Sequence, residues 1–402
     1  MKETIQRVGI LGGGQLGWML GIAAHRLGFE TVFLDPAAEC PVDAWGDRIR
    51  APFDDPEALQ ELADRCEVAT FEFENVPSAA IELLSRRIPV RPGLRSLECT
   101  QDRLVEKRFL SHTGIPVPPN HDLTVPGDLD AAIERTGLPA MMKTRRMGYD
   151  GKGQARVASR ADAEALMGEM SGPAILEGLV DFDYEASVLV VRSLDGEMKS
   201  WPPIANHHEG GILRCSRAPC SSLTTEAAQR MREMAMKVAH ALEHVGVLAV
   251  EFFIRGDEIL ANEIAPRVHN SGHVTNEFSR TSQFENHIRA ITGRPLGGTE
   301  GVHEVGLMFN GIGDHPARDS PSTKSWRRID RDGEPSTDLR DGVPTWYDYR
   351  KAARAGRKLG HLTIVGERVD DESIRRMVDA LPGAAPPPEA WEPNAQRSNA
   401  EA

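Results

Sequence analysis

Hydrophobic residues in the first hundred positions alternate between short continuous runs and runs at helical spacing. Residues 8–11 form an apolar strand, and a glycine-rich turn over residues 12–17 follows it. Apolar side chains then recur three and four positions apart, up to a glycine placed to end a helix: Leu16, Met19, Leu20, Ala23, Ala24, Leu27 and Gly28. Further apolar runs at residues 31–34, 68–71 and 89–90 predict strands. This strand–helix–strand order predicts a parallel sheet in a first domain over residues 1–102.

The pattern changes after residue 103, where helices and strands alternate at longer spacing. Helical spacing marks residues 104–112, 128–136, 160–170 and 225–244, and apolar runs predict strands at residues 174–177, 185–190 and 246–250. We expect sheets covered by helices on one side, an α+β arrangement. A strand over residues 305–310 opens the last part, a polar stretch over residues 314–344 predicts a long excursion or loop, and the proline-rich tail from residue 382 predicts disorder.

Composition describes an ordinary soluble globular protein. The chain has 402 residues, 40% hydrophobic and 27% charged, and its apolar runs are far shorter than the roughly 20 residues of a membrane span. Its formal net charge of −13 argues against nucleic-acid binding, which normally needs a basic surface. Five cysteines without a Cys-x-x-Cys pair predict reduced thiols in a cytoplasm. Because the N-terminus runs straight into a strand, we expect no signal peptide.

The turn over residues 12–17 has the Gly-x-Gly-x-x-Gly spacing of a dinucleotide-binding loop. Gly12, Gly14 and Gly17 lie between a strand and a helix, and Asp35 ends the next strand, where an acid would hold a ribose. Exposed amides at a helix N-terminus bind any phosphate, however, and glycines alone allow a tight turn. We therefore favour a phosphate other than that of NAD(P), with a purely structural turn as the alternative.

A second glycine-rich segment, residues 147–153, follows a strand that carries Lys143. It lacks the Gly-Lys-Ser/Thr ending of a P-loop, but glycine amides and Lys152 can still cover a polyphosphate. Glu177 and Glu185 flank residues 178–184 between two strands, where an extended backbone can meet an adenine and a carboxylate can hold a ribose. A hairpin turn with a solvated lysine and ordinary strand-end carboxylates are the plain alternatives.

The segment over residues 262–273 concentrates polar chemistry. It contains an amide, a carboxylate, a guanidinium and two imidazoles: Asn262, Glu263, Arg267, His269 and His273. With Glu251 on the preceding strand, two carboxylates and an amide suit Mg²⁺ carried with a nucleotide phosphate. A three-residue turn centred on Asp257 would place the two carboxylates directly opposite, whereas a four-residue turn would split them. The two histidines could bind zinc on a helix, but the proline and glycine among them predict a loop.

Closely spaced basic residues follow near the C-terminus. Lys351, Arg354, Arg357 and Lys358 predict either an anion site or a solvated surface.

Taken in order, these segments resemble the ATP-grasp superfamily, and within it the 5-(carboxyamino)imidazole ribonucleotide synthases, the ATP- and bicarbonate-dependent carboxylases of purine biosynthesis. The markers are residues 12–17, 71–77, 148–154, 262–273 and 354–361. The resemblance implies a Rossmann-like α/β domain (1–102), an ATP-grasp domain (103–300) and a small C-terminal domain (301–381), with residues 382–402 as a tail. It also implies a homodimer that uses ATP and Mg²⁺, which Mn²⁺ could replace.

The implied reaction has two stages. ATP phosphorylates bicarbonate to carboxyphosphate, which breaks down to CO₂ and phosphate, and the amine of 5-aminoimidazole ribonucleotide captures the CO₂ as a carbamate. Because carboxyphosphate is short-lived in water, this needs a closed, dry site. The strongest alternative is a formate-dependent glycinamide ribonucleotide transformylase, also an ATP-grasp enzyme. A biotin carboxylase would need a Met-Lys-Met carrier motif, which is not present, and a NAD-dependent dehydrogenase leaves residues 143–273 unexplained.

The resemblance also implies a role for individual residues. For ATP it implies Arg103, Lys143, Met147, Gly148, Gly151, Gly153, Glu177, Gly178, Leu179, Val180, Glu185, His208, Asn262 and Glu263, and for Mg²⁺ it implies Glu251 and Glu263. For bicarbonate and the chemical steps it implies Tyr149, Asp150, Lys152, Arg267, His269, Asn270 and Lys351, with Asp150 as the base for the amine proton. For the ribonucleotide it implies Gly14, Gln15, Leu16, Glu72, Asn75, Ser271, Arg354, Arg357 and Lys358, with Arg357 and Lys358 at its 5′-phosphate. His207, beside His208, leaves open which imidazole faces ATP.

Overall fold

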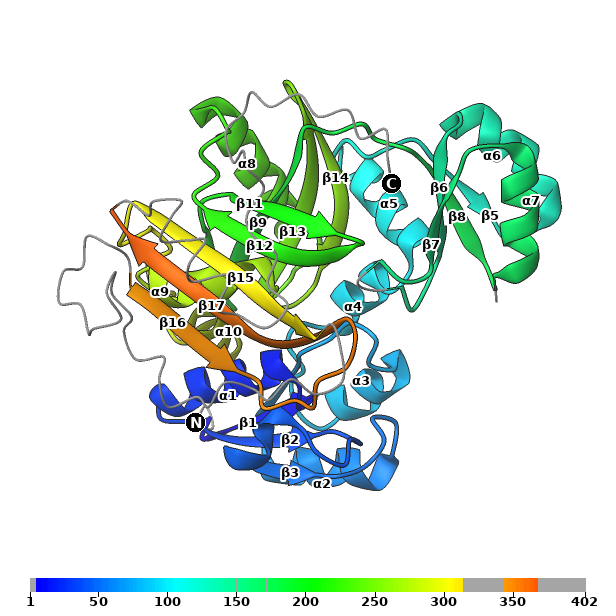
Figure 1. Ribbon diagram of the computed structural model, residues 1–402. Coiled ribbons are helices and arrows are strands. Elements are labelled where there is room, and N and C mark those ends of the chain that lie inside the picture. The colour runs from blue at the N-terminus through cyan, green and yellow to red at the C-terminus, as the bar shows by residue number, and fades with distance from the viewer. Residues whose placement is uncertain (1–4, 149–150, 171, 314–342, 368–402) are drawn as a thin grey trace.

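Three β-sheets with helices packed around them make up the protein, in a computed structural model that describes residues 5–148, 151–170, 172–313 and 343–367 (Figure 1). One sheet is parallel and two are antiparallel, which confirms the predicted combination of α/β and α+β folds. Within these ranges, no helix has the length and apolar character needed to cross a membrane.

The N-terminal sheet is parallel, as its strand–helix–strand pattern predicts. Its order is β3-β2-β1-β4, from β1 (Arg7–Leu11), β2 (Glu30–Leu34), β3 (Asp47–Ile49) and β4 (Val68–Phe71). Helix α1 (Gln15–Arg26) follows the glycine turn and ends before Gly28, whose φ of +83° favours glycine. The 3-10 turn η1 (Pro41–Ala44) precedes β3, and α2 (Pro56–Arg65) and α3 (Ser78–Ser85) pack on the sheet face opposite α1, followed by α4 (Leu94–Thr100). The strand predicted at residues 89–90 is a single bridge between Ala69 and Val90.

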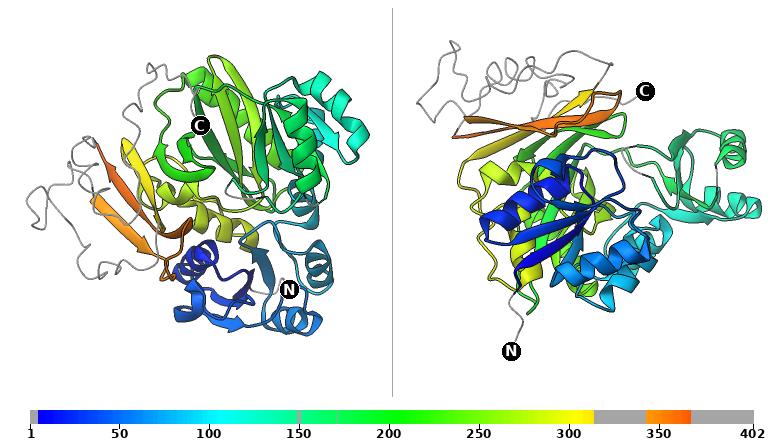
Figure 2. Two further views of the ribbon diagram at one scale, coloured as in Figure 1. Left: turned by 45° about the vertical axis from the view of Figure 1, so that its right-hand side comes forward. Right: turned by 90° about the horizontal axis from the view of Figure 1, so that it is seen from below.

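A small antiparallel sheet forms an outer lobe (residues 120–178) that projects from the rest of the molecule (Figures 1 and 2). Its order is β5-β8-β6-β7, from β5 (Asn120–Leu123), β6 (Ala140–Thr144), β7 (Gln154–Val157) and β8 (Ala174–Gly178). The 3-10 turn η2 (Pro126–Asp128), α6 (Leu129–Thr136) and α7 (Arg160–Glu169) complete it, and both helices share an apolar core with the sheet.

The largest sheet has nine strands and continues into the C-terminal part of the chain. Its order is β14-β13-β9-β11-β12-β15-β17-β16, with β10 beside β9. The strands are β9 (Tyr184–Arg192), β10 (Met198–Ser200), β11 (Ile204–Glu209), β12 (Ile212–Ala218), β13 (Gly246–Arg255), β14 (Glu258–Ala265), β15 (Val305–Gly313), β16 (Val343–Asp348) and β17 (Arg357–Gly366).

The strands expected in a separate C-terminal domain therefore extend the central sheet, because β12 pairs directly with β15. The boundary proposed at residue 301 divides one continuous sheet, and the domain bounds stay a prediction. Of the expected excursion over residues 314–344, the last two residues begin β16, and residues 314–342 lie outside the described part of the chain, as do residues 382–402.

Helices cover both faces of the central sheet and connect it to the N-terminal sheet. Helix α8 (Thr225–Ala241) packs on one face, and α5 (Arg103–His112) lies against β14. The segment η3 (Ser271–Val274), α9 (Thr275–Phe278) and α10 (Gln283–Thr292) covers the other face, where α10 contacts α1. One apolar core thus contains residues of both sheets, such as Ile10 of β1 and Val247 of β13, and fixes the N-terminal glycine turn relative to β13 and β14.

Candidate active site

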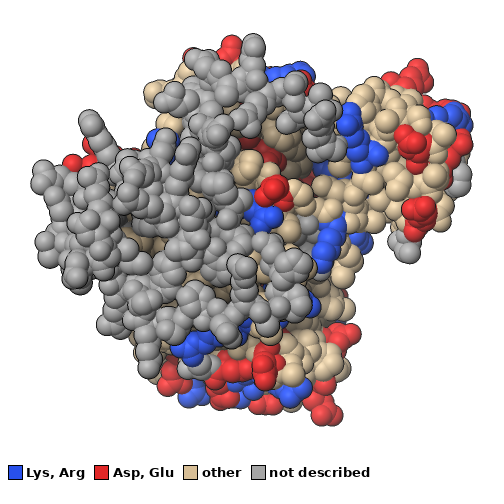
Figure 3. All heavy atoms as spheres, in the orientation of Figure 1, with Lys and Arg blue, Asp and Glu red and all other residues tan. Residues whose placement is uncertain are grey.

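A pocket of about 660 Å³ lies where the outer lobe, the N-terminal sheet and the central sheet meet. Figure 3 shows acidic and basic side chains side by side in the hollow between the outer lobe and the rest of the molecule. Most of the predicted site residues line this pocket: Gln15, Leu16, Glu72, Asn75, Arg103, Lys143, Met147, Gly148, Gly151, Glu177, Gly178, Leu179, Val180, Glu185, His208, Glu251, Asn262, Glu263, Arg267, His269, Asn270 and Lys358.

Other predicted residues do not line the pocket: Gly14, Lys152, Gly153, Ser271, Lys351, Arg354 and Arg357. Ser271 is buried behind it, where its hydroxyl lies 2.9 Å from Nδ1 of His269. Lys351 reaches the pocket only through the side-chain amide of Gln15. Tyr149 and Asp150 lie outside the described residues. Of the two adjacent imidazoles, His208 is the one that faces the pocket.

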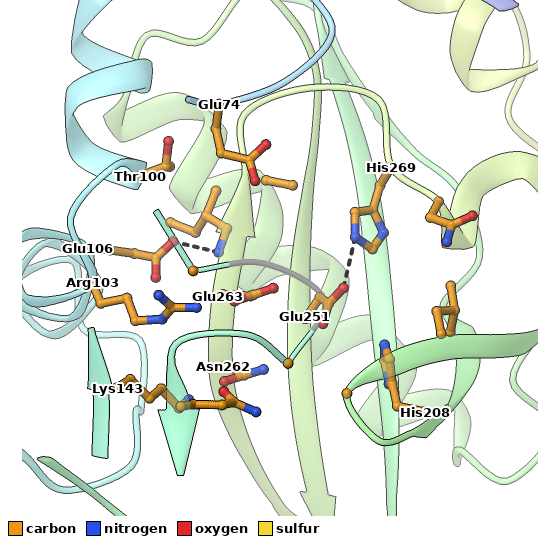
Figure 4. Close-up of a pocket in the computed structure, with 18 of the residues that line it drawn as sticks. Glu74, Thr100, Arg103, Glu106, Lys143, His208, Glu251, Asn262, Glu263 and His269 are labelled. Carbon is orange, nitrogen blue, oxygen red and sulfur yellow. Dashed lines mark hydrogen bonds and ion pairs between the residues drawn. The ribbon is translucent and has the colours of Figure 1, made fainter. Parts of the chain in front are cut away.

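Glu251 and Glu263 lie directly opposite each other on β13 and β14, but neither the three-residue nor the four-residue turn considered from the sequence forms. Arg255 pairs with Glu258, so only two residues form the turn, and such a turn alone would align Glu251 with Asn262. A β-bulge adds one residue to β14 at Asn262 and shifts the register by one. The bulge therefore brings the two carboxylates together at the pocket floor (Figure 4).

Two carboxylate–imidazole pairs set the charge on the central-sheet side of the pocket. Nε2 of His269 lies 2.9 Å from Glu251, and although burial alone would raise the pKa of Glu251, His269 lowers it to about 2. Nδ1 of His208 lies 2.6 Å from Glu185, and although burial opposes it, Glu185 raises the pKa of His208 to about 9. The His208 imidazole can thus face an anionic ligand in the charged form.

A buried carboxylate between two lysines connects the outer lobe to α5. Glu177 is 2% exposed, and its carboxylate lies 2.9 Å from Nζ of Lys143 and 3.5 Å from Nζ of Lys107. Burial alone would raise the pKa of Glu177, but the two ammonium groups lower it to about 2. The side chain of Glu177 thus holds lysines, and a role beside adenine would fall to its backbone and to the residues that follow it.

The N-terminal glycine turn has its amides occupied by the chain's own carboxylates. Glu72 accepts hydrogen bonds from the amides of Gly14 at 2.6 Å and Gly17 at 2.5 Å, and Asp35 accepts one from the amide of Gly13 at 2.7 Å. These three amides already have acceptors, and a buried carboxylate lies at the N-terminus of α1, where a bound phosphate would otherwise be favoured. Asp35, the acid of the dinucleotide spacing, caps the turn itself, and a ligand for the turn stays a prediction.

The second glycine loop, as far as it is described, packs closely against both sides of the pocket. A Cβ atom at Gly148 would overlap the guanidinium of Arg103, and one at Gly151 would lie 2.8 Å from the carbonyl oxygen of Gly210 in the turn between β11 and β12. Glycine at these two positions therefore allows a close approach to the Arg103 side chain and to the Gly210 backbone.

Several lining residues escaped the sequence prediction. Glu74 forms an ion pair with Arg267, although it lies within the marker segment over residues 71–77. Phe182 and Phe253 stack with ring centroids 4.8 Å apart and supply an apolar wall. Glu106 lies beside Glu263, and burial raises its pKa to about 8. Only contacts between distant segments reveal these residues, so no local signal identified them.

Unpartnered polar atoms occur on three of the described side chains that line the pocket. Asn270 has both its amide nitrogen and its oxygen buried without a hydrogen-bond partner, and Asn262 and Glu177 each have one oxygen in the same state. Buried polar groups in native proteins normally have partners, so these atoms leave hydrogen-bonding capacity unused beside the pocket.

Comparisons with known proteins give one consistent result. The ribonucleotide synthetase preATP-grasp domain matches residues 5–101, the ATP-grasp domain matches residues 108–284, and the phosphoribosylaminoimidazole carboxylase C-terminal domain matches residues 306–375. A Pseudomonas aeruginosa protein named N5-carboxyaminoimidazole ribonucleotide synthase is 42% identical over 89% of this chain and 94% of its own length.

Solved structures agree with this result. The crystal structure of N5-carboxyaminoimidazole ribonucleotide synthetase from Thermus thermophilus is 40% identical, has a TM-score of 0.84, and covers 93% of this chain and 98% of its own. The Aspergillus clavatus synthase, crystallised with ADP and 5-aminoimidazole ribonucleotide, is 31% identical, has a TM-score of 0.81, and covers 94% of this chain and 98% of its own.

Proposed function

Because the chain belongs to the N5-carboxyaminoimidazole ribonucleotide synthases of the ATP-grasp superfamily, we propose that the 660 Å³ pocket is its active site. The protein is an ATP-dependent carbon–nitrogen ligase of purine biosynthesis. It converts 5-aminoimidazole ribonucleotide, bicarbonate and ATP into N5-carboxyaminoimidazole ribonucleotide, ADP and phosphate, through carboxyphosphate. The observation that carries the site assignment is the placement of Glu251 opposite Glu263, facing the cationic side chains of the same pocket.

We propose that ATP lies between the outer lobe and β14. The apolar wall of Phe182 and Phe253, with the backbone at Leu179 and Val180, suits the adenine, and Glu185 is placed for the ribose. Arg103 and Lys143 contribute positive charge for the phosphates, and the loop over residues 147–153 excludes water from them.

We propose that Glu251 and Glu263 hold Mg²⁺, with the unpartnered oxygen of Asn262 beside them. The donor set fits, because Mg²⁺ prefers hard oxygen ligands and usually takes only one or two carboxylates together with phosphates and water. Within the described ranges no three His, Cys, Asp or Glu side chains converge on one point, which agrees with such an incomplete protein shell. Bound with ATP, the ion neutralises charge on the transferring phosphoryl group.

We propose that bicarbonate and carboxyphosphate bind next to Arg267, His269 and Asn270. The unpartnered amide of Asn270 offers both a donor and an acceptor there. Arg267 is already paired with Glu74, so an arriving anion must share or displace that carboxylate. The amine proton of the ribonucleotide would go to Asp150, whose role stays a prediction because it lies outside the described residues.

The ribonucleotide would lie between the N-terminal sheet and the C-terminal strands. Gln15, Leu16, Asn75 and Lys358 line that side of the pocket. Lys351 contacts Gln15, and burial lowers the pKa of Lys351 to about 8. We propose that Arg354, Arg357 and Lys358 hold the 5′-phosphate, and that Lys351 acts on the substrate through its contact with Gln15.

ADP release by the purified protein tests the function. The assay contains Mg²⁺ and ATP, with 5-aminoimidazole ribonucleotide and bicarbonate each added or omitted. Turnover should depend on both. Turnover that needs formate and glycinamide ribonucleotide instead would move the substrate to the transformylase alternative.

We further propose a cytoplasmic homodimer. Five unpaired cysteines, which fit a reducing compartment, support the location, and the family resemblance alone supports the dimer. Sedimentation equilibrium tests the dimer, and a monomer at micromolar concentration would contradict it.

A further inference from the structure

We infer that Glu106 and Lys107 are positioning residues that hold the Glu263 carboxylate opposite Glu251 by hydrogen bonding to the backbone on both sides of it. The inference rests on the proposed role of these carboxylates in metal binding. The ammonium of Lys107 donates a hydrogen bond to the carbonyl oxygen of Asn262, immediately before Glu263. The amide of Ile264, immediately after it, donates one to the Glu106 carboxylate at 2.7 Å (Figure 4).

The bulge in β14 explains why these two hydrogen bonds are needed. Asn262 has no partner on β13, because Glu251 pairs with Glu263 and Phe252 pairs with Ala261. An extra residue disrupts the local ladder, and a strand with one unpaired residue can slip back by one position. A slip would align Glu251 with Asn262 and turn Glu263 to the other face of the sheet.

Strand β14 lies at the edge of the central sheet. Helix α5 packs along that edge, where a neighbouring strand would otherwise pair. Successive residues of a helix point about 100° apart, so two adjacent side chains can reach two successive backbone groups of a strand beside the helix. Glu106 is 3% exposed and Lys107 is 1% exposed, so water cannot replace either contact. The two residues therefore satisfy backbone groups that lack a strand partner because β14 lies at the edge of the sheet.

Lys107 also connects these backbone contacts to the side of the pocket where we propose that ATP binds. Its ammonium lies 3.5 Å from the carboxylate of Glu177, which contacts Lys143 of the outer lobe at 2.9 Å. The position of Glu263 and the position of a lysine proposed to bind phosphate thus depend on one buried side chain.

A matched pair of variants at one position isolates the backbone contact. Glu106→Gln and Glu106→Met both remove the carboxyl group at similar length, but only glutamine keeps an acceptor for the Ile264 amide. The measurements are the Mn²⁺ affinity of the enzyme–ADP complex, from the electron paramagnetic resonance signal of free Mn²⁺, and the ADP affinity in EDTA, from calorimetry.

Glu106→Met should weaken Mn²⁺ binding by about 10- to 100-fold, the usual effect of losing a group that orients a metal ligand. Its ADP affinity in EDTA should stay near the wild-type value, and Glu106→Gln should retain most of the Mn²⁺ affinity. A folded Glu106→Met protein with unchanged Mn²⁺ affinity overturns the inference. Equal losses in the two variants overturn it as well, because loss of the acceptor for the Ile264 amide would then not be the cause.

Two further variants separate this inference from the metal assignment. Glu263→Gln should weaken Mn²⁺ binding, and adding Glu106→Met to it should cause no further loss, since Glu106 acts through Glu263. If Glu263→Gln binds Mn²⁺ normally, the metal assignment fails and the inference falls with it. If Glu106→Met does not fold, Lys107→Met provides the test, and unchanged Mn²⁺ affinity in that variant overturns the inference.

Discussion

Replacing Glu72 by Gln should destabilise the N-terminal glycine turn. The Glu72 carboxylate accepts hydrogen bonds from two backbone amides, Gly14 and Gly17, at the start of α1. Glutamine keeps one acceptor oxygen, but its NH₂ group must face the second amide. The variant therefore loses one charge-assisted hydrogen bond and opposes two donors in a buried site.

The structure sets the expected size of this loss. A hydrogen bond to a charged group contributes about 1.5–3 kcal/mol, and a negative charge at a helix N-terminus adds about 0.3–1 kcal/mol. Burial raises the pKa of Glu72, because removing a carboxylate from water is costly. Part of the free energy gained from the hydrogen bonds therefore offsets this desolvation cost. We expect the unfolding free energy to fall by about 2–3 kcal/mol, which is a factor of roughly 30–150 in the unfolding equilibrium.

Glu67 provides a matched control on the same sheet. Its carboxylate also accepts two backbone hydrogen bonds, from the amides of Gln6 at 2.9 Å and Arg7 at 2.7 Å, but these bonds are exposed. One oxygen of Glu67 accepts both bonds, so glutamine can keep them, and water can replace either; Glu67→Gln should therefore cost less than about 1 kcal/mol. Urea unfolding of both variants gives the comparison, and equal costs would refute the reasoning. The KM for 5-aminoimidazole ribonucleotide, measured below the unfolding transition, tests separately whether Glu72 also binds substrate.

Three other predictions concern the pocket and the thiols. Glu263→Gln should abolish ATP turnover by removing metal-binding charge, and near-normal ADP release would refute the assignment. The His208 imidazole should titrate near pH 9 by NMR, since Glu185 raises its pKa. Because this lies above the unfolded value of about 6.5, the stabilisation from the pair should be complete below that pH and be lost as pH rises through about 9, so the stability gap to Glu185→Gln should shrink there. Burial raises the pKa of Cys40 to about 11 and of the other four cysteines as far or further, so Ellman's reagent at pH 8 should label the native protein slowly and all five thiols quickly in denaturant.

Local sequence patterns predicted elements better than they predicted contacts between elements. The helices around residues 104–112 and 160–170 and the strand at residues 8–11 follow from periodicity within each segment, and the structure confirms them. The paired carboxylates depend instead on a bulge. A three-residue turn and a two-residue turn followed by one extra residue both place Glu251 opposite Glu263. Nothing in the residues around Asn262 shows which of the two forms.

The remaining differences between the sequence predictions and the structure come from side chains that are distant in the sequence. The glycine turn has the spacing of a phosphate-binding loop, but Glu72, immediately after β4, occupies the amides of Gly14 and Gly17, and Asp35 occupies that of Gly13. Lys107 sits in a helix with many charged neighbours, where a solvated face is the ordinary expectation, yet it is buried against Glu177. Such effects arise when distant segments meet, so a single sequence carries no local sign of them.

The continuity of the central sheet limits how this protein can be divided. Cutting the chain near residue 301 would remove β15, β16 and β17 and leave β12 as an open edge with unpaired amides and carbonyls. Open edges of this kind pair with other chains and promote aggregation. A fragment that ends at the boundary between the matched domains should therefore be poorly soluble, and an autonomous catalytic core must include strands beyond that boundary.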